Sequence, residues 1–298
     1  MAEPETYEAN ALVESKLHEC IRALETKLEA DVLAFSGPIY ANADLFIRDA
    51  IEWRRRQRAK RRKLAFFLET SGGFIEITQR IATIIRRYYK RIEFFVPDAA
   101  MSAGTVLVMS GDRIHMDYYS VLGPIDPQVP KADGGYLPAL GYLKKYKELM
   151  DKADKGSLNT AEVTYLCTKF DPAMLYQYEH ARQLSVYLLE QWLTKYKFRD
   201  WKRTQRRKLT VTLAMKKARA KEIADILNDT ETWHSHGHGI SMAVLRSRRI
   251  KLQIEDFGED KDLSRRIRDY WALLSDHMAK VGAPGVIHAN GWYKHLRW

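Results

Sequence analysis

The sequence predicts an α/β fold, in which parallel strands alternate with helices. Apolar runs at 31–39, 64–68 and 92–96 are each followed by glycine, proline or small residues that favour turns. The segments between these runs carry apolar residues at helical spacing. Strands that alternate with helices in this way are typical of an α/β domain with a parallel sheet.

The first half of the chain predicts the following elements in order. A leading amphipathic helix is expected from Tyr7 to Ala30, with apolar residues that include Leu17, Ile21 and Leu24. The strands and helices after it are expected at 31–39 (strand), 43–58 (helix), 64–68 (strand), 74–89 (helix), 92–96 (strand) and 102–110 (helix). Right-handed crossovers would join them into successive βα units.

Helical spacing dominates the second half of the chain. After a loop at 129–135, helices are expected at 137–154, 159–170, 172–196 and 209–227. Residues Arg249 to Ile254 predict one more strand, and the chain then reads as a helix with a Gly- and aromatic-rich end. We therefore expect an N-terminal helix at 1–30, one α/β domain at 31–256 and a helical tail at 257–298.

Length and composition favour a cytoplasmic globular protein. A chain of 298 residues, of which 46% are hydrophobic, can bury a large core and is not globally disordered. Two cysteines, Cys20 and Cys167, are too few for a disulfide framework. The first residues lack the basic and apolar segments of a signal peptide, and no apolar run reaches the roughly 20 residues needed to span a bilayer.

The net charge of +11 is unevenly placed along the chain. Arg54 to Lys63 contains eight basic residues in ten, and smaller groups lie at 202–208 and 246–249. Such clusters attract nucleic acid, acidic proteins or anionic lipid. A solvated helix end, where cations complement the macrodipole, is the alternative. No zinc finger, ribonucleoprotein motif or clear helix-turn-helix supports sequence-specific DNA binding.

Ser102 lies in the most informative stretch, Ala-Met-Ser-Ala-Gly-Thr at 100–105, directly after the apolar run 92–96. A strand that passes into a helix at this serine would aim unpaired backbone N–H groups and the positive end of the helix dipole at whatever the hydroxyl attacks. Such a place favours a developing oxyanion. The same sequence also suits an ordinary helix N-cap.

A second turn upstream carries paired glycines. The apolar run 64–68 ends in Glu-Thr-Ser-Gly-Gly, where Gly72 and Gly73 let the backbone turn tightly and present another N–H group. A Gly-Gly pair after a strand is also a common plain turn. The order of the two motifs predicts that they form one acyl-transfer site.

The motif order resembles that of the Clp protease/crotonase superfamily. Strand, Ser-Gly-Gly, helix, strand, Met-Ser-Ala-Gly-Thr, helix and strand are followed by Leu-Gly-Pro-Ile-Asp-Pro-Gln at 122–128. Within the superfamily the chain is most similar to the serine dehydrogenase proteinase family, relatives of bacterial signal peptide peptidase. The similarity extends from about Asp31 to about Asp256 and is sharpest from Leu64 to Gln128.

The resemblance implies a fold, an activity and an assembly. The fold would be a Clp/crotonase-like spiral of βα units with an added helical C-terminal region. The activity would be hydrolysis of polypeptides by a serine peptidase, with no cofactor. A homo-oligomer is also implied, and the aromatic and leucine-rich face at 184–192 is expected to pack in the core or against another subunit.

The resemblance implies a role for individual residues of this sequence. The nucleophile matches Ser102, and the oxyanion hole matches the N–H groups of Gly73 and Ala103. Where Clp proteases carry the catalytic histidine, this chain has Asp126, so the usual Ser-His-Asp triad does not carry over whole. The third triad member would fall near Asp229.

The base that activates Ser102 is left open, because a free serine hydroxyl is a poor nucleophile. Signal peptide peptidases use a buried lysine, for which Lys131 and Lys169 are the candidates. Asp126 could act directly or through a neighbour, although an aspartate beside prolines also suits a turn. The third candidate is the histidine-rich segment 232–239.

Three histidines alternate in the segment 232–239, and they would point the same way if it were extended. His236 is chosen as the base because it is the central one. Alternation also suits a zinc site, but no cysteine or carboxylate stands at ligand spacing, so no metal is expected. Solvated or structural histidines are the plain alternative.

Two rival functions remain at this stage. A crotonase-type enzyme would use the same paired N–H groups on an acyl-CoA thioester and would tolerate loss of Ser102. A catalytically inactive scaffold would bind nucleic acid or an acidic partner through Arg54 to Lys63. Fold alone does not distinguish among these functions.

Overall fold

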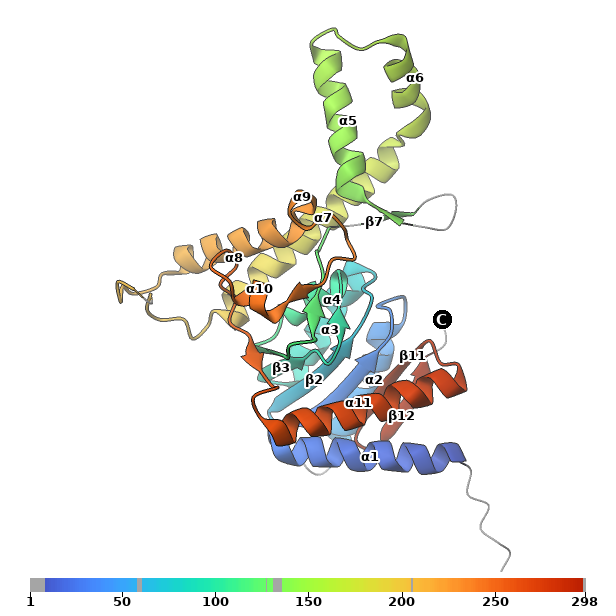
Figure 1. The fold of residues 1–298 in the computed structure, drawn as a ribbon, viewed down its shortest axis with the longest axis vertical. Coiled ribbons are helices and arrows are strands. Elements are labelled where there is room, and N and C mark those ends of the chain that lie inside the picture. The colour runs from blue at the N-terminus through green and yellow to red at the C-terminus, as the bar shows by residue number, and fades with distance from the viewer. Residues whose placement is uncertain (1–8, 58–60, 127, 131–135, 205, 297–298) are drawn as a thin grey trace, which may run out of the picture.

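A seven-stranded sheet lies at the centre of the computed structural model, which describes residues 9–57, 61–126, 128–130, 136–204 and 206–296 (Figure 1). Its strand order is β10-β5-β3-β2-β1-β11-β12. The strands are β1 (Asp31–Ser36), β2 (Lys63–Glu69), β3 (Arg91–Phe95), β5 (Arg113–Met116), β10 (Glu255–Asp256), β11 (Gly285–Ala289) and β12 (Trp292–Leu296). β10, β5, β3, β2 and β1 are parallel, whereas β11 and β12 are antiparallel to their neighbours. The predicted α/β class is confirmed.

Helices cover both faces of this sheet, which explains why its strands are continuous apolar runs. Val32 and Ala34 of β1 face one helical layer, and Leu33 and Phe35 face the other. The first layer is α1 (Ala9–Leu28) with α11 (Lys261–Val281), and the second contains α2 (Ala43–Arg56), α3 (Ile75–Tyr88) and α4 (Ala103–Val108). Helices α1 to α4 begin and end close to the residues predicted for them.

A second, small sheet connects the carboxyl ends of the parallel strands to the segments that follow them. It comprises β4 (Ala99–Ala100), β6 (Val121–Leu122) and β9 (Ile240–Ser241). Thr70, just after β2, bridges to Ala100: the Thr70 N–H donates to Ala99 O at 2.9 Å, and the Met101 N–H donates to Thr70 O at 2.9 Å. This bridge holds the glycine turn after β2 beside the turn that contains Ser102.

The middle of the chain forms a helical arm that extends away from the sheet (Figure 1). The arm begins with the hairpin of β7 (Gln128–Pro130) and β8 (Tyr136–Pro138) and continues through α5 (Ala139–Asp154) and α6 (Thr160–Lys169). The chain returns along α7 (Pro172–Trp192), a π-helical turn (Leu193–Lys197) and α8 (Leu213–Asn228). Leu189 of α7 and Ile223 of α8 join the same core as Phe94, so the return pair packs over α3 and α4.

Two predictions for the end of the chain are wrong. Residues 249–254 are not a strand: the only sheet pairing there is at Glu255 and Asp256 in the described residues. The side chains of Ile250, Leu252 and Ile254 pack into the core, which explains the alternation. The backbone of this segment pairs with no strand in the described residues. The tail expected to be helical over 257–298 is helical only to Val281, and β11 then pairs with β1. Short strands of this kind depend on their partner strand more than on local propensity.

The densest basic segment is partly used inside the molecule. Arg54 is 6% exposed, and its Nη2 lies 2.9 Å from Asp31 Oδ1, while its Nε donates to Glu25 Oε1 at 3.1 Å. Arg61 donates to the Glu25 and Ala30 carbonyls. These contacts tie α1, β1 and α2 together, so part of the charge seen in the sequence is structural. Residues 58–60 lie outside the described chain.

Arg54→Met should destabilise the protein by about 3–5 kcal/mol, because it removes the cation that two buried carboxylates share. Glu25 is 4% exposed and Asp31 fully buried, and burial raises the pKa of Asp31 above its ordinary value. Urea unfolding at pH 7 measures the loss, with Arg56→Met as the control, since the Arg56 side chain is 75% exposed on the same helical turn. Equal stability of the two variants would contradict a structural role for Arg54.

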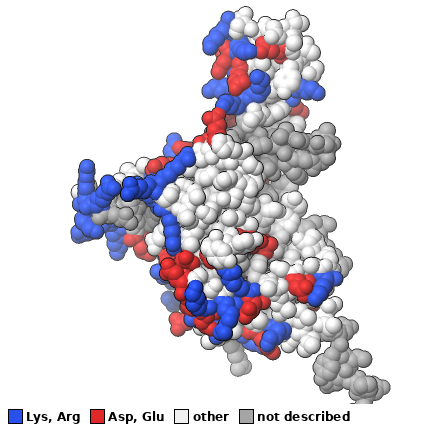
Figure 2. All heavy atoms as spheres, in the orientation of Figure 1, with Lys and Arg blue, Asp and Glu red and all other residues white. Residues whose placement is uncertain are grey.

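A second basic group projects into solvent. Figure 2 shows Lys and Arg side chains gathered on the turn that joins the far ends of α7 and α8. The exposed cations of this turn are Lys202, Arg203, Arg206, Arg207 and Lys208. Unlike Arg54, they form no ion pair with a buried carboxylate in the described part of the chain, and they give this end of the molecule a strongly positive surface.

Candidate active site

Ser102 occupies a strained turn between β4 and α4. Its backbone has φ 52° and ψ −119°, a conformation that residues with a side chain rarely adopt. The turn is fixed from below by Thr105, whose hydroxyl donates to Ala100 O at 2.7 Å and accepts from the Gly123 N–H at 2.9 Å. Strain at a serine between a strand and a helix is typical of nucleophiles, because the turn exposes the hydroxyl.

Gly72 is required by the close approach of the two turns. Its φ is 104°, and a Cβ atom there would lie 2.7 Å from the Ser102 Cβ. Any side chain at Gly72 would therefore displace Ser102, which explains why the glycine turn can lie directly against the serine.

The N–H group of Gly73 points away from Ile39, the residue with which Gly73 forms a β-bridge. Ile39 N–H donates to Gly72 O at 2.8 Å, and Phe74 N–H donates to Ile39 O at 2.9 Å. Gly72 and Phe74, the residues on either side of Gly73, make both hydrogen bonds of the bridge to Ile39. The Gly73 N–H is therefore directed away from Ile39. Among the hydrogen bonds of the described residues, neither this N–H nor that of Ala103, the first residue of α4, reaches a protein acceptor. Both residues line one cavity with Ser102.

His236 and Asp126 form a hydrogen-bonded pair in the same place. His236 Nδ1 lies 3.0 Å from Asp126 Oδ1, and Asp126 is fully buried. The Asp126 Oδ2 atom has no hydrogen-bond partner within the described part of the chain, so His236 is the main partner of this carboxylate. Because an ionised carboxylate can only accept, it assigns the proton to Nδ1 and leaves Nε2 as the acceptor nitrogen.

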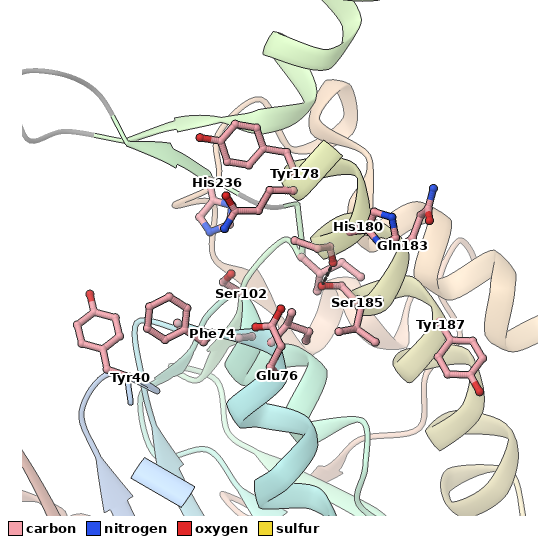
Figure 3. A pocket seen from close by; sticks show the side chains of 18 of the residues that line it. Tyr40, Phe74, Glu76, Ser102, Tyr178, His180, Gln183, Ser185, Tyr187 and His236 are labelled. Carbon is pink, nitrogen blue, oxygen red and sulfur yellow. Dashed lines mark hydrogen bonds between the residues drawn. The ribbon is translucent and has the colours of Figure 1, made fainter. Parts of the chain in front are cut away.

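The local chain explains how His236 reaches this position. It lies in the turn between α9 (Thr230–Trp233) and β9, and Trp233 anchors that turn by donating from Nε1 to Ile226 O at 2.7 Å. Asp126 follows β6, where the Ile125 N–H donates to Leu227 O at 3.0 Å. Figure 3 shows the His236 imidazole over Ser102 at one side of the cavity. Within the described residues no hydrogen bond joins the two side chains, and such catalytic hydrogen bonds often form only when substrate binds.

The histidine-rich segment 232–239 is not extended. Residues 234–237 form bends and turns, and His234 has φ 60°, so the three imidazoles do not share one face. His236 alone of the three lines the cavity, while the His238 ring packs 5.5 Å from that of Trp233.

Lys169 and Asp229 do not line the cavity that contains Ser102. Lys169 is exposed at the end of α6, and it does not line the cavity. Lys131 lies outside the described residues. Asp229 accepts from the Glu231 N–H at 3.1 Å and from the Thr232 hydroxyl, which makes it a cap of α9.

The cavity has a volume of about 1640 Å³ and is walled largely by α7. Its aromatic rim includes Tyr40 and Phe74, which are 41% and 54% exposed and whose rings lie 5.8 Å apart. The face of α7 toward the cavity was missed by sequence reasoning. The feature of the sequence that could have indicated this face is the helical spacing of Tyr176, His180, Gln183 and Tyr187. The volume exceeds that of a typical small-molecule pocket and suits a segment of a polymer.

Fold and cavity together have the layout of an α/β serine hydrolase: a strained serine, free backbone N–H groups and a histidine–aspartate pair. The chain belongs to the ClpP-like SDH-type serine proteinase family, whose profile matches residues 8–178. This confirms the family that the sequence resembles. The matched range contains Gly73, Ser102 and Asp126, whereas His236 lies beyond it.

Two curated relatives are uncharacterized proteins of Methanocaldococcus jannaschii. One is 33% identical over 132 residues, covering 43% of this chain and 44% of the relative. The other is 25% identical over 168 residues, covering 53% of this chain and 56% of the relative. The chain thus spans about half the length of these relatives.

Among solved structures, an alanine mutant of the 1510-N membrane-bound stomatin-specific protease is similar to this chain. It is 18% identical, with a TM-score of 0.32, and the match covers 49% of this chain and 74% of that one. Across the described residues of the present chain, no helix has both the length and the apolar character needed to cross a membrane.

Proposed function

We propose that this protein is a serine endopeptidase with the triad Ser102, His236 and Asp126. The observation that carries the proposal is the 3.0 Å contact between His236 Nδ1 and Asp126 Oδ1 in the cavity that contains Ser102. It supplies a base to a chain that has an aspartate where Clp proteases carry their histidine. In chain order the triad is serine, aspartate, histidine, and such reordering is known among unrelated hydrolases.

The reaction follows from this arrangement. Ser102 Oγ forms a bond to the peptide carbonyl carbon while its proton passes to His236 Nε2. The carbonyl electrons move to oxygen, which the N–H groups of Gly73 and Ala103 stabilise as an oxyanion. The C–N bond then breaks as His236 returns the proton to the leaving amine, and a water molecule repeats the steps to release the acyl group. Asp126, buried against the ring, stabilises the imidazolium that forms at each transfer.

The substrate we propose is an extended or unfolded polypeptide segment. The cavity volume of about 1640 Å³ and its aromatic rim favour a chain with apolar side chains over a compact metabolite. The chain belongs to a ClpP-like family, and on that ground we propose that it forms a homo-oligomer.

A fluorophosphonate probe tests the proposed nucleophile. The probe should phosphonylate Ser102 with loss of fluoride, and peptide mapping by mass spectrometry should find one adduct there. The Ser71→Ala variant is the matched control, because Ser71 lines the same cavity and should not be needed for labelling. An adduct on Ser71, or no adduct in any oligomeric state, would remove the support for an activated Ser102.

A further inference from the structure

A second cluster of functional side chains lies between α1, α11 and the β11–β12 hairpin. Four histidines occupy this layer: His18 of α1, His277 of α11, His288 of β11 and His295 of β12. None of them lines the cavity that holds Ser102. The layer therefore belongs to a different part of the molecule from the proposed peptidase site.

Two of these histidines are already paired. Tyr270 OH lies 2.9 Å from His288 Nδ1, and His288 Nε2 lies 2.9 Å from His18 Nδ1. Burial lowers the pKa of both His18 and His288, so the pair is neutral and held by ordinary hydrogen bonds. These two imidazoles have no need of a further ligand.

The other two histidines converge on a carboxylate. Glu14 of α1, His277 and His295 each offer one ligand atom, and these three atoms lie within 4.8 Å of one another. His277 is 3% exposed, and its Nε2 atom is buried without a hydrogen-bond partner in the described chain. A buried polar atom without a partner is unfavourable, so His277 Nε2 is available to bind a ligand.

We propose that Glu14, His277 and His295 form a binding site for a divalent transition metal ion of the zinc type. Two imidazoles and one carboxylate suit Zn²⁺, whereas Mg²⁺ and Ca²⁺ prefer oxygen ligands alone. Bonds of about 2.0–2.2 Å place tetrahedral ligand atoms about 3.4 Å apart, so side-chain movements of about 1 Å would close the site. Glu14 is half-buried, and the fourth position is left for water.

Metal at this site would join distant parts of the chain. The three ligands come from the first helix, the last helix and the last strand described. Binding to the folded chain alone stabilises it, because the unfolded chain does not hold the ligands together. The proposed role is therefore to fasten the β11–β12 hairpin against α1 and α11, independently of peptidase activity.

Calorimetric titration of the chelator-treated protein with ZnCl₂ tests this site. The wild type should bind one ion per chain and show a higher melting temperature with zinc. The variants Glu14→Gln and His277→Gln should each lower the affinity at least tenfold, given that even outer-shell changes at metal sites cost 10–100-fold. Glu14→Gln alters a half-buried side chain, so it keeps the test valid where His277→Gln folds poorly.

The exposed histidine turn provides the control. His234→Gln with His238→Gln removes two imidazoles outside both sites and should leave zinc binding unchanged. Cobalt in place of zinc should give visible absorption bands in the wild type that Glu14→Gln removes. Binding lost only in the His234 and His238 variant, or no stoichiometric zinc in the wild type, would overturn the proposal.

Discussion

Ser102→Ala should lower kcat/KM for an unfolded polypeptide substrate by about 10⁶-fold, the loss seen when a serine protease loses its nucleophile. The methyl group cannot form the acyl-enzyme, while the N–H groups of Gly73 and Ala103 remain to polarise a bound carbonyl. A small residual rate is therefore expected. The backbone at position 102 keeps its strained φ of 52° with either residue, so the melting temperature should change little.

Cleavage of a quenched fluorescent polypeptide measures this loss. Ser71→Ala removes a neighbouring hydroxyl from the same cavity wall and should change KM more than kcat. Full activity in Ser102→Ala would exclude the peptidase mechanism proposed here. It would favour instead a reaction that uses the backbone N–H groups alone, as in a thioester enzyme of the crotonase type.

Asp126→Asn should lower kcat by about 10⁴-fold, as the corresponding change does in an established Ser-His-Asp triad. An asparagine amide can donate to His236 Nδ1, which moves the ring proton to Nε2. That nitrogen then cannot accept the proton of Ser102. Because Asp126 is fully buried, solvent cannot replace the lost carboxylate.

A double-mutant cycle tests whether Asp126 acts through His236 or independently of it. His236→Ala combined with Asp126→Asn should be no slower than His236→Ala alone, since the aspartate acts only through the ring. Asp229→Asn is the matched control: Asp229 is the aspartate expected from the resemblance, and here it caps a helix. A large loss in Asp229→Asn with an active Asp126→Asn would assign the triad differently.

Much of the fold could be predicted because its signals are local. The apolar runs that became β1, β2 and β3 are bounded by turn residues, and the helices between them keep the 3.6-residue period of an amphipathic face. Residues 249–254 show the limit of such signals, since their alternation reflects core burial alone. The β11–β12 hairpin was missed for the complementary reason: its place in the sheet depends on β1, at the other end of the chain.

Some features of the candidate site could likewise be predicted from local sequence, and others could not. The turns at Gly72, Gly73 and Ser102 could be predicted by sequence alone, because paired glycines and small residues after apolar runs favour turns. The wall formed by α7 could not be assigned, since its helical face suits a core or a subunit contact equally well.

The sequence by itself determined the family, the α/β class and the serine and glycine turns, all of which rest on short segments with strong backbone preferences. Only the tertiary structure decided the partner of His236. Asp126 lies 110 residues away from it in sequence. Their contact exists because β6 and β9 pair in the small sheet, which brings the segments that carry Asp126 and His236 together. No local property of either segment encodes that distance.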